Sequence, residues 1–249
     1  MSDAAARRVA LVADARSYVG PSLATLLASR GHDLVLGDPS DELLADLANL
    51  GANVEAVVGA KSPEDGSAAR QLVDAALARF GRLDAAISFS GRITMGRFMN
   101  ATVDQFRSTI EGCMIAPFHF LQAVLAPMIE QRAGQVLVIT SASAARPTPG
   151  APLYSAARAG ATHLVRNVAD EVARHGIQVN AVGTNFMDFP GFIEASGAND
   201  PEVRARIESR VPLGRLGTMP EFAHFCAPFV DGTSTFTTGQ FVAYAGGWA

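Results

Sequence analysis

Three residues of this 249-residue chain have types and spacing that could perform acid–base chemistry. Tyr154 and Arg158 are four positions apart, so on a helix they lie on one face, one turn apart. A fixed guanidinium charge beside a phenol favours the phenolate, and a phenolate can serve as a general base. Ser141 precedes Tyr154 by 13 positions and could donate a hydrogen bond to the same substrate oxygen. An ordinary helix surface is the alternative explanation for the Tyr–Arg pair.

A doubly wound α/β fold would bring these residues together. Longer segments of helical periodicity alternate with short apolar runs, which indicates a Rossmann-like parallel sheet of about seven strands with helices on both faces. The expected strands are Val9–Val12, Asp33–Leu36, Val54–Val58, Leu83–Ile87, Val136–Ile139, Ile177–Val182 and Gln240–Tyr244. Glycines at 31, 51, 81, 134 and 176 are expected to end helices in the left-handed conformation, and Thr102 with Gln105 resembles a capping box.

Composition limits the class of protein. The chain has 49% hydrophobic and 18% charged residues, enough for a large core, and we expect one domain over residues 1–249. A net charge of −4 offers no basic surface for nucleic acid or membrane. The two cysteines are far apart and the five histidines lack ligand spacing, so we expect no metal site. No signal-peptide or membrane segment is evident, which predicts a cytoplasmic protein.

The first strand is followed by a turn that departs from a dinucleotide site. Ligands bind at the carboxyl ends of strands in such sheets, and a glycine-rich turn there lets the backbone approach a pyrophosphate. Here Asp14 and Tyr18 stand where the first two glycines belong, and Gly20 alone is kept. A carboxylate and a phenol ring would repel and obstruct a pyrophosphate. We therefore expect no cofactor, although Asp38 ends the second strand where an NAD enzyme binds ribose.

These motifs resemble the short-chain dehydrogenase/reductase superfamily over nearly the full chain, and within it the halohydrin dehalogenases. The Ser-x12-Tyr-x3-Arg pattern, an aromatic at Tyr18 and a partial match to a Pro-Asn-aromatic loop at 184–186 carry the resemblance. It implies a cofactor-free carbon–halogen lyase and a homotetramer. A haloalcohol would close to an epoxide with halide release, and small anions such as azide, cyanide or nitrite would reopen the epoxide.

The resemblance also implies site roles. Tyr154 would remove the hydroxyl proton, Arg158 would hold the phenolate, and Ser141 would bind the substrate oxygen. The residues expected to bind halide or substrate are Tyr18, Phe89, Thr184, Asn185, Phe186, Met187 and Phe192. Two alternatives stay open: an NAD(P)-dependent reductase with a degenerate glycine turn, and a non-catalytic relative. Trp248, near the C-terminus, could reach a neighbouring subunit or pack in its own.

Overall fold

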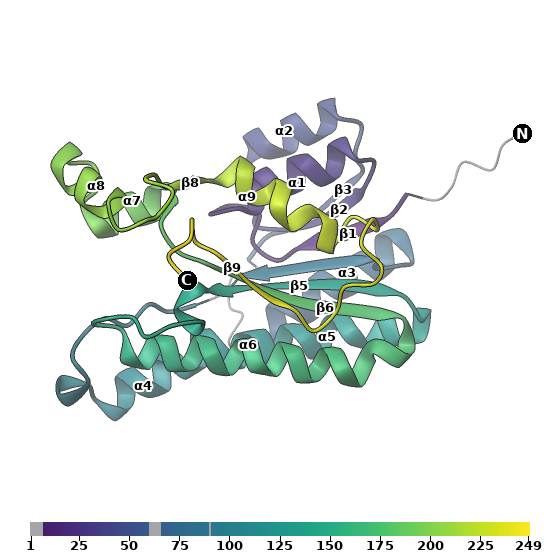
Figure 1. Ribbon diagram of the computed structural model, residues 1–249. Coiled ribbons are helices and arrows are strands. Elements are labelled where there is room, and N and C mark those ends of the chain that lie inside the picture. Colours follow the sequence, from purple (N-terminus) through teal and green to yellow (C-terminus); the bar gives the residue numbers. More distant parts are fainter. Residues whose placement is uncertain (1–6, 60–65, 90) are drawn as a thin grey trace, which may run out of the picture.

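The computed structural model describes residues 7–59, 66–89 and 91–249. Seven parallel strands form one sheet in the order β3-β2-β1-β4-β5-β6-β9. This confirms the predicted doubly wound fold, with helices packed on both faces of the sheet (Figure 1). The strands of this sheet are β1 (Val9–Val12), β2 (Asp33–Gly37), β3 (Val54–Val57), β4 (Ala85–Phe89), β5 (Gly134–Ser141), β6 (Ile177–Thr184) and β9 (Phe241–Tyr244).

The helices divide between the two faces of the sheet. On one face lie α1 (Gly20–Ser29), α2 (Asp41–Asn49) and α9 (Met219–Cys226), and on the other α3 (Ser67–Phe80), α5 (Ala116–Gln131) and α6 (Pro152–Val172). Successive residues of β1 alternate between the two cores: Leu11 packs with the α3–α5–α6 side and Val12 with the α1–α9 side. This alternation buries both faces of the sheet, which explains the continuous apolar runs in the sequence.

The remaining elements are short or lie at the edges. A capping box of Thr102 and Gln105 opens α4 (Val103–Ile110), as predicted, and a π-helical turn, η2 (Glu111–Ile115), joins α4 to α5. Two strands that the sequence did not predict, β7 (Met187–Asp188) and β8 (Gly217–Thr218), pair beside the main sheet. The others are α7 (Pro190–Ser196), α8 (Pro201–Glu208), η1 (Phe98–Asn100), η3 (Ala142–Ala144), η4 (Ala173–His175) and η5 (Ala227–Phe229).

One glycine has a different role from the predicted one. Arg132, not Gly134, ends α5 in the left-handed conformation, with φ 56°. Gly134 is already the first residue of β5, and a Cβ there would lie 2.4 Å from the Met128 sulfur. Glycine is therefore needed at 134 for close packing of α5 against the strand, while Gly31, Gly51, Gly81 and Gly176 have the positive φ that was expected.

Candidate active site

The candidate site lies at the carboxyl ends of β1, β4, β5 and β6. Ser141 is the last residue of β5 and pairs in register with Thr184, the last residue of β6. Parallel strands end at the same edge of the sheet, so Ser141 and Thr184 lie side by side where ligands bind in such folds. The Ser141 side chain is buried, and its Oγ accepts hydrogen bonds from the backbone N–H of Ser143 (3.2 Å) and from Ser143 Oγ (2.9 Å).

The first turns of α6 carry the other two predicted catalytic residues. Pro152 at the helix start fixes the backbone for the first turn, and Tyr154 and Arg158 follow on one face. The guanidinium carbon of Arg158 lies 5.1 Å from the centre of the Tyr154 ring, and Arg158 is buried. A cation at this distance from a ring interacts favourably with its electrons. The structure thus places the predicted pair in contact.

Gly91, just past β4, lies directly against the Arg158 guanidinium. A Cβ built on Gly91 would lie 1.8 Å from Nη2 of Arg158, so only a glycine leaves room for the guanidinium in this position. The backbone φ of 155° at Gly91 is also uncommon for other residues. This contact could not be predicted from the sequence, because nothing local to residue 91 indicates which side chain will approach it.

Tyr18 crosses the strand ends from the turn after β1. Its backbone has φ 52°, and its hydroxyl lies 2.6 Å from the hydroxyl of Thr184. The ring makes edge contacts with Phe89 and Phe189, with ring centres 5.5 and 4.7 Å apart. Burial raises the pKa of the Tyr18 hydroxyl, opposed by the Thr184 hydrogen bond and the charge of Arg158, so Tyr18 is a neutral hydrogen-bonding group. The Tyr18 side chain therefore contacts both Phe89 and Thr184, two other predicted site residues.

Two aromatic neighbours of Tyr18 were not among the predicted site residues. Phe189 follows β7, and Phe222, on α9, has its ring centre 5.9 Å from that of Tyr18. The predicted Phe192 lies beside Phe186 and Phe189, and its ring centre is 6.4 Å from each of theirs. Phe222 could not have been found from sequence because more than 200 positions separate it from Tyr18.

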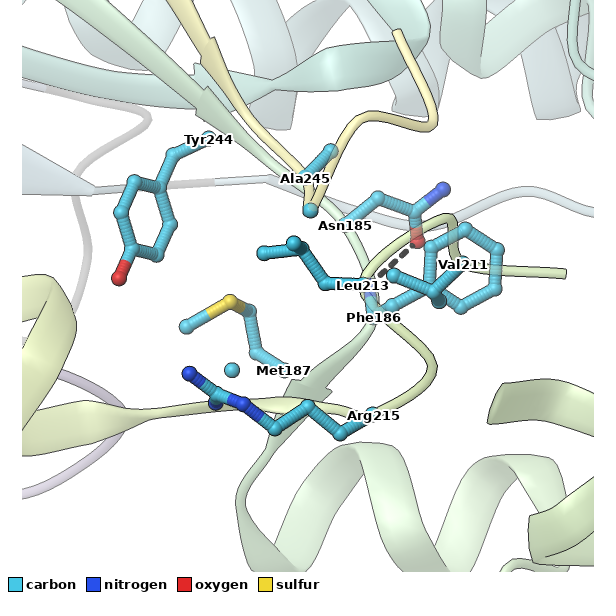
Figure 2. A pocket seen from close by; sticks show the side chains of 10 residues that line it. Asn185, Phe186, Met187, Val211, Leu213, Arg215, Tyr244 and Ala245 are labelled. Atoms are coloured by element: carbon cyan, nitrogen blue, oxygen red, sulfur yellow. Dashed lines mark hydrogen bonds between the residues drawn. The ribbon is translucent and has the colours of Figure 1, made fainter. Parts of the chain in front are cut away.

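The remaining predicted residues line a separate cavity. Asn185, Phe186 and Met187 border a space of about 100 Å³ with residues of the 211–217 segment and of 244–246 (Figure 2). The lining does not include Ser141, Tyr154 or Arg158. Arg215 at this cavity pairs with both carboxylate oxygens of Glu221 and lowers the pKa of that carboxyl to about 2. These residues therefore stand beside the Ser–Tyr–Arg set and do not enclose it.

The turn between β1 and α1 can be tested against a dinucleotide cofactor. The Asp14 carboxylate accepts hydrogen bonds from the backbone N–H groups of Arg16 (2.8 Å) and Ser17 (3.1 Å). An internal anion thus takes the donors that a phosphate would use, and the Tyr18 ring lies over the strand ends. Gly20 is kept because a Cβ there would lie 2.0 Å from the Asp14 carbonyl oxygen. As they lie here, these residues do not fit a pyrophosphate.

Asp38 makes a hydrogen bond within the chain. Its carboxylate accepts a hydrogen bond from the backbone N–H of Gly59 (2.8 Å), which ties the end of β2 to the end of β3. Ser40, not Asp38, caps α2 by accepting from the Leu43 N–H. The buried Asp38 is therefore a strand-end carboxylate that holds two strand ends together.

The C-terminal segment packs against its own chain. The Trp248 side chain is 8% exposed, with its ring centre 5.4 Å from that of Phe186. Arg146 stacks over the indole at 4.7 Å and donates a hydrogen bond to the Trp248 carbonyl oxygen (2.6 Å). These contacts anchor the C-terminus beside η3, next to Ser141. In this structure the tryptophan packs in its own subunit.

Comparison with known proteins reveals full-length relatives. Residues 12–249 match the family model described as enoyl-(acyl carrier protein) reductase. The chain is 32% identical over 256 residues to the cis-4-hydroxycyclohexanecarboxylate dehydrogenase of Sinomonas cyclohexanicum, covering 100% of this chain and 99% of that one. It is 30% identical over 244 residues to the 3-oxoacyl-(acyl-carrier-protein) reductase of Escherichia coli K12, covering 96% of each.

Solved structures share the fold. A levodione reductase superposes with a TM-score of 0.87 at 27% identity, covering 96% of each chain. A structure described as a dehalogenation enzyme superposes with a TM-score of 0.83 at 26% identity, covering 98% of each chain.

The sequence relatives correct the expected activity. They are named as reductases and dehydrogenases, which overturns the expected halohydrin dehalogenase function, with its epoxide products, and the carbon–halogen lyase class. The superfamily part of the resemblance is confirmed, while the solved dehalogenation enzyme is less similar in sequence, at 26% identity, than these two relatives. The chain belongs to the short-chain dehydrogenase/reductase superfamily, in the family described as enoyl-(acyl carrier protein) reductase.

Proposed function

We propose that this protein is an oxidoreductase that interconverts a hydroxyl and a carbonyl group on a small substrate. The observation that carries the proposal is the Ser141–Tyr154–Arg158 set at the strand ends of a chain whose relatives are named reductases and dehydrogenases. The 32%-identical relative is named for a cyclic secondary alcohol, which makes such alcohols and the matching ketones the first substrates to test.

The residues of this chain supply the proton-transfer half of the reaction. In oxidation, the Ser141 hydroxyl donates to the substrate oxygen and the Tyr154 phenolate accepts the hydroxyl proton. The guanidinium of Arg158, 5.1 Å from the ring centre, stabilises the phenolate. In reduction, Tyr154 returns the proton to the carbonyl oxygen.

A nicotinamide dinucleotide supplies the hydride chemistry in enzymes with this kind of reaction. The turn at residues 14–20, as it lies here, does not accept the pyrophosphate of such a cofactor. Dinucleotide binding must therefore be measured in its own right, separately from turnover.

The test uses the purified chain with each dinucleotide. Binding of NADH and NADPH is measured by nicotinamide fluorescence, and turnover of cis-4-hydroxycyclohexanecarboxylate with NAD⁺ or NADP⁺ by absorbance. We expect one dinucleotide to bind once the 14–20 turn moves from the position it has here. We expect turnover to fall by about 10²–10⁴ in Tyr154→Phe, the usual contribution of a general base. Tyr244→Phe makes the same chemical change beside the neighbouring cavity and should keep full activity. Absence of binding by both dinucleotides, together with no turnover, would overturn the proposal.

We also propose that the protein forms a cytoplasmic homotetramer. In support, the helical stretch 103–131 carries large apolar side chains on its outer face that a second copy could cover: Val103, Phe106, Ile115 and Phe118. By length and composition this stretch could cross a membrane, but 50% of its most apolar window is buried against the fold. Partial burial of this kind is typical of a core helix that also forms a contact between subunits.

A further inference from the structure

The Ser141 hydroxyl accepts two hydrogen bonds from Ser143, which is not one of the three proposed catalytic residues. Ser143 lies in η3, the short turn that begins directly after Ser141, and both side chains are buried. The Ser143 N–H bond to Ser141 Oγ (3.2 Å) is the ordinary cap of such a turn. The second bond, from the Ser143 hydroxyl at 2.9 Å, is not needed for a cap.

Counting protons and lone pairs at Ser141 Oγ fixes the direction of its own hydrogen bond. A serine hydroxyl has one proton and two lone pairs. Ser143 donates to Oγ twice, so both lone pairs are engaged and the proton remains. That proton points to the Thr184 carbonyl oxygen at 3.4 Å, beyond the usual range for O–H···O bonds. A substrate oxygen at normal distance would replace this weak bond.

We infer that Ser143 is a positioning residue that makes Ser141 an obligatory hydrogen-bond donor to the substrate oxygen. A hydroxyl that accepts two hydrogen bonds is also polarised into a stronger donor. The inference rests on the proposed function and adds a requirement on the substrate atom that binds Ser141. The substrate atom at Ser141 must be an acceptor, either a carbonyl oxygen or an alcohol oxygen whose own proton is directed to Tyr154.

A hydroxyl that is fixed as a hydrogen-bond donor matters most when negative charge develops on the substrate oxygen. A donor fixed in place stabilises the developing oxyanion more than it stabilises the bound substrate. Losing the Ser143 hydroxyl should therefore lower kcat and leave KM unchanged, whereas a general loosening of the site would raise KM as well.

The experiment compares Ser143→Ala with Ser143→Thr, which keeps a hydroxyl at the same position. With cis-4-hydroxycyclohexanecarboxylate as the probe, we expect kcat to fall about tenfold in Ser143→Ala, the effect of one hydrogen bond. KM should stay unchanged, and Ser143→Thr should restore kcat. Thermal melting of each variant checks that the fold is intact. Ser141→Ala, which removes the donor itself, should be slower than either variant.

A crystal structure of Ser143→Ala gives a readout that does not depend on turnover. We expect Ser141 Oγ to leave its place opposite the Thr184 carbonyl in Ser143→Ala and to keep it in Ser143→Thr. If the wild-type chain does not turn over this probe, the crystal structures alone decide, and an unmoved Ser141 Oγ in Ser143→Ala overturns the inference. The proposed function fails separately, by absence of both dinucleotide binding and turnover. With turnover, an unchanged kcat in Ser143→Ala, or an equal loss in both variants, overturns it.

Discussion

The hydroxyl of Tyr18 lies 2.6 Å from the hydroxyl of Thr184, and this bond joins the turn after β1 to the end of β6. It spans the strand ends where other members of the superfamily need an open glycine turn. Because Tyr18 also packs on Phe89 from β4, one side chain links three strand ends. The Tyr18 ring therefore covers this edge of the sheet, and the bond ties the ring to β6.

Replacing Tyr18 with glycine should increase dinucleotide affinity. The backbone of Tyr18, with φ 52°, suits glycine, and loss of the ring uncovers the strand ends. We expect an affinity gain of about tenfold, or about 1.4 kcal/mol, measured by NADH fluorescence. Tyr18→Phe removes the Thr184 bond but keeps the ring, so it should bind NADH like the wild type. Equal affinity in Tyr18→Gly and wild type would show that the ring is no obstacle.

A methyl group on Gly91 should disable the site through Arg158. In Gly91→Ala the new Cβ would lie 1.8 Å from Nη2 of Arg158, so the guanidinium must shift from its present position beside the Tyr154 ring. We expect kcat to fall by about tenfold or more, in line with loss of a positioned charge. The double variant Gly91→Ala with Arg158→Ala should be no slower than Arg158→Ala alone, because the two changes act on one interaction. Additive losses would contradict this relationship.

Stability should decrease below neutral pH through His32. Burial, then the charge of Arg8, lowers the pKa of His32 below 6.5 in the folded chain. Its Nε2 is buried and has no hydrogen-bond partner among the described residues. The unfolded chain thus binds the proton more tightly, so the free energy of unfolding is largest above pH 6.5 and falls as pH drops through the folded value.

Chemical denaturation at several pH values measures this effect. His32→Asn removes the titrating group and should flatten the decrease below about pH 6.5. His163→Asn is the matched control at an exposed histidine and should keep the wild-type decrease. A wild-type curve parallel to that of His32→Asn would contradict the prediction.

A charge on the outer face of α4 should prevent assembly. Phe106 is 42% exposed, and Phe106→Glu would place a carboxylate in the proposed subunit contact. We expect the tetramer to dissociate to smaller species in analytical ultracentrifugation, with little change in the melting of the subunit. Leu50→Glu, at an exposed leucine on the opposite helical layer, should leave the assembly unchanged. A wild-type monomer would refute the proposed tetramer.

Several features of the fold were determined by the sequence because they depend on local physics. The buried runs of β1 and β2 begin at the predicted residues, and the capping box at Thr102 opens α4 as predicted. Strand ends were less accurate: β5 runs from Gly134 to Ser141, well beyond Val136–Ile139, because pairing with β6 extends it past its apolar centre. The spacing of Tyr154 and Arg158 fixed their contact because both lie on one helix.

Only the tertiary structure decided which distant residues meet. Three contacts join segments that are far apart in the chain: Arg158 against Gly91, Phe222 against Tyr18, and the Tyr18–Thr184 hydrogen bond. No local pattern in the sequence encodes such pairs. The activity expected from sequence failed for a related reason. Ser, Tyr and Arg side chains with the spacing of Ser141, Tyr154 and Arg158 suit proton transfer at a substrate oxygen in many reactions, so the pattern does not identify which reaction a chain catalyses.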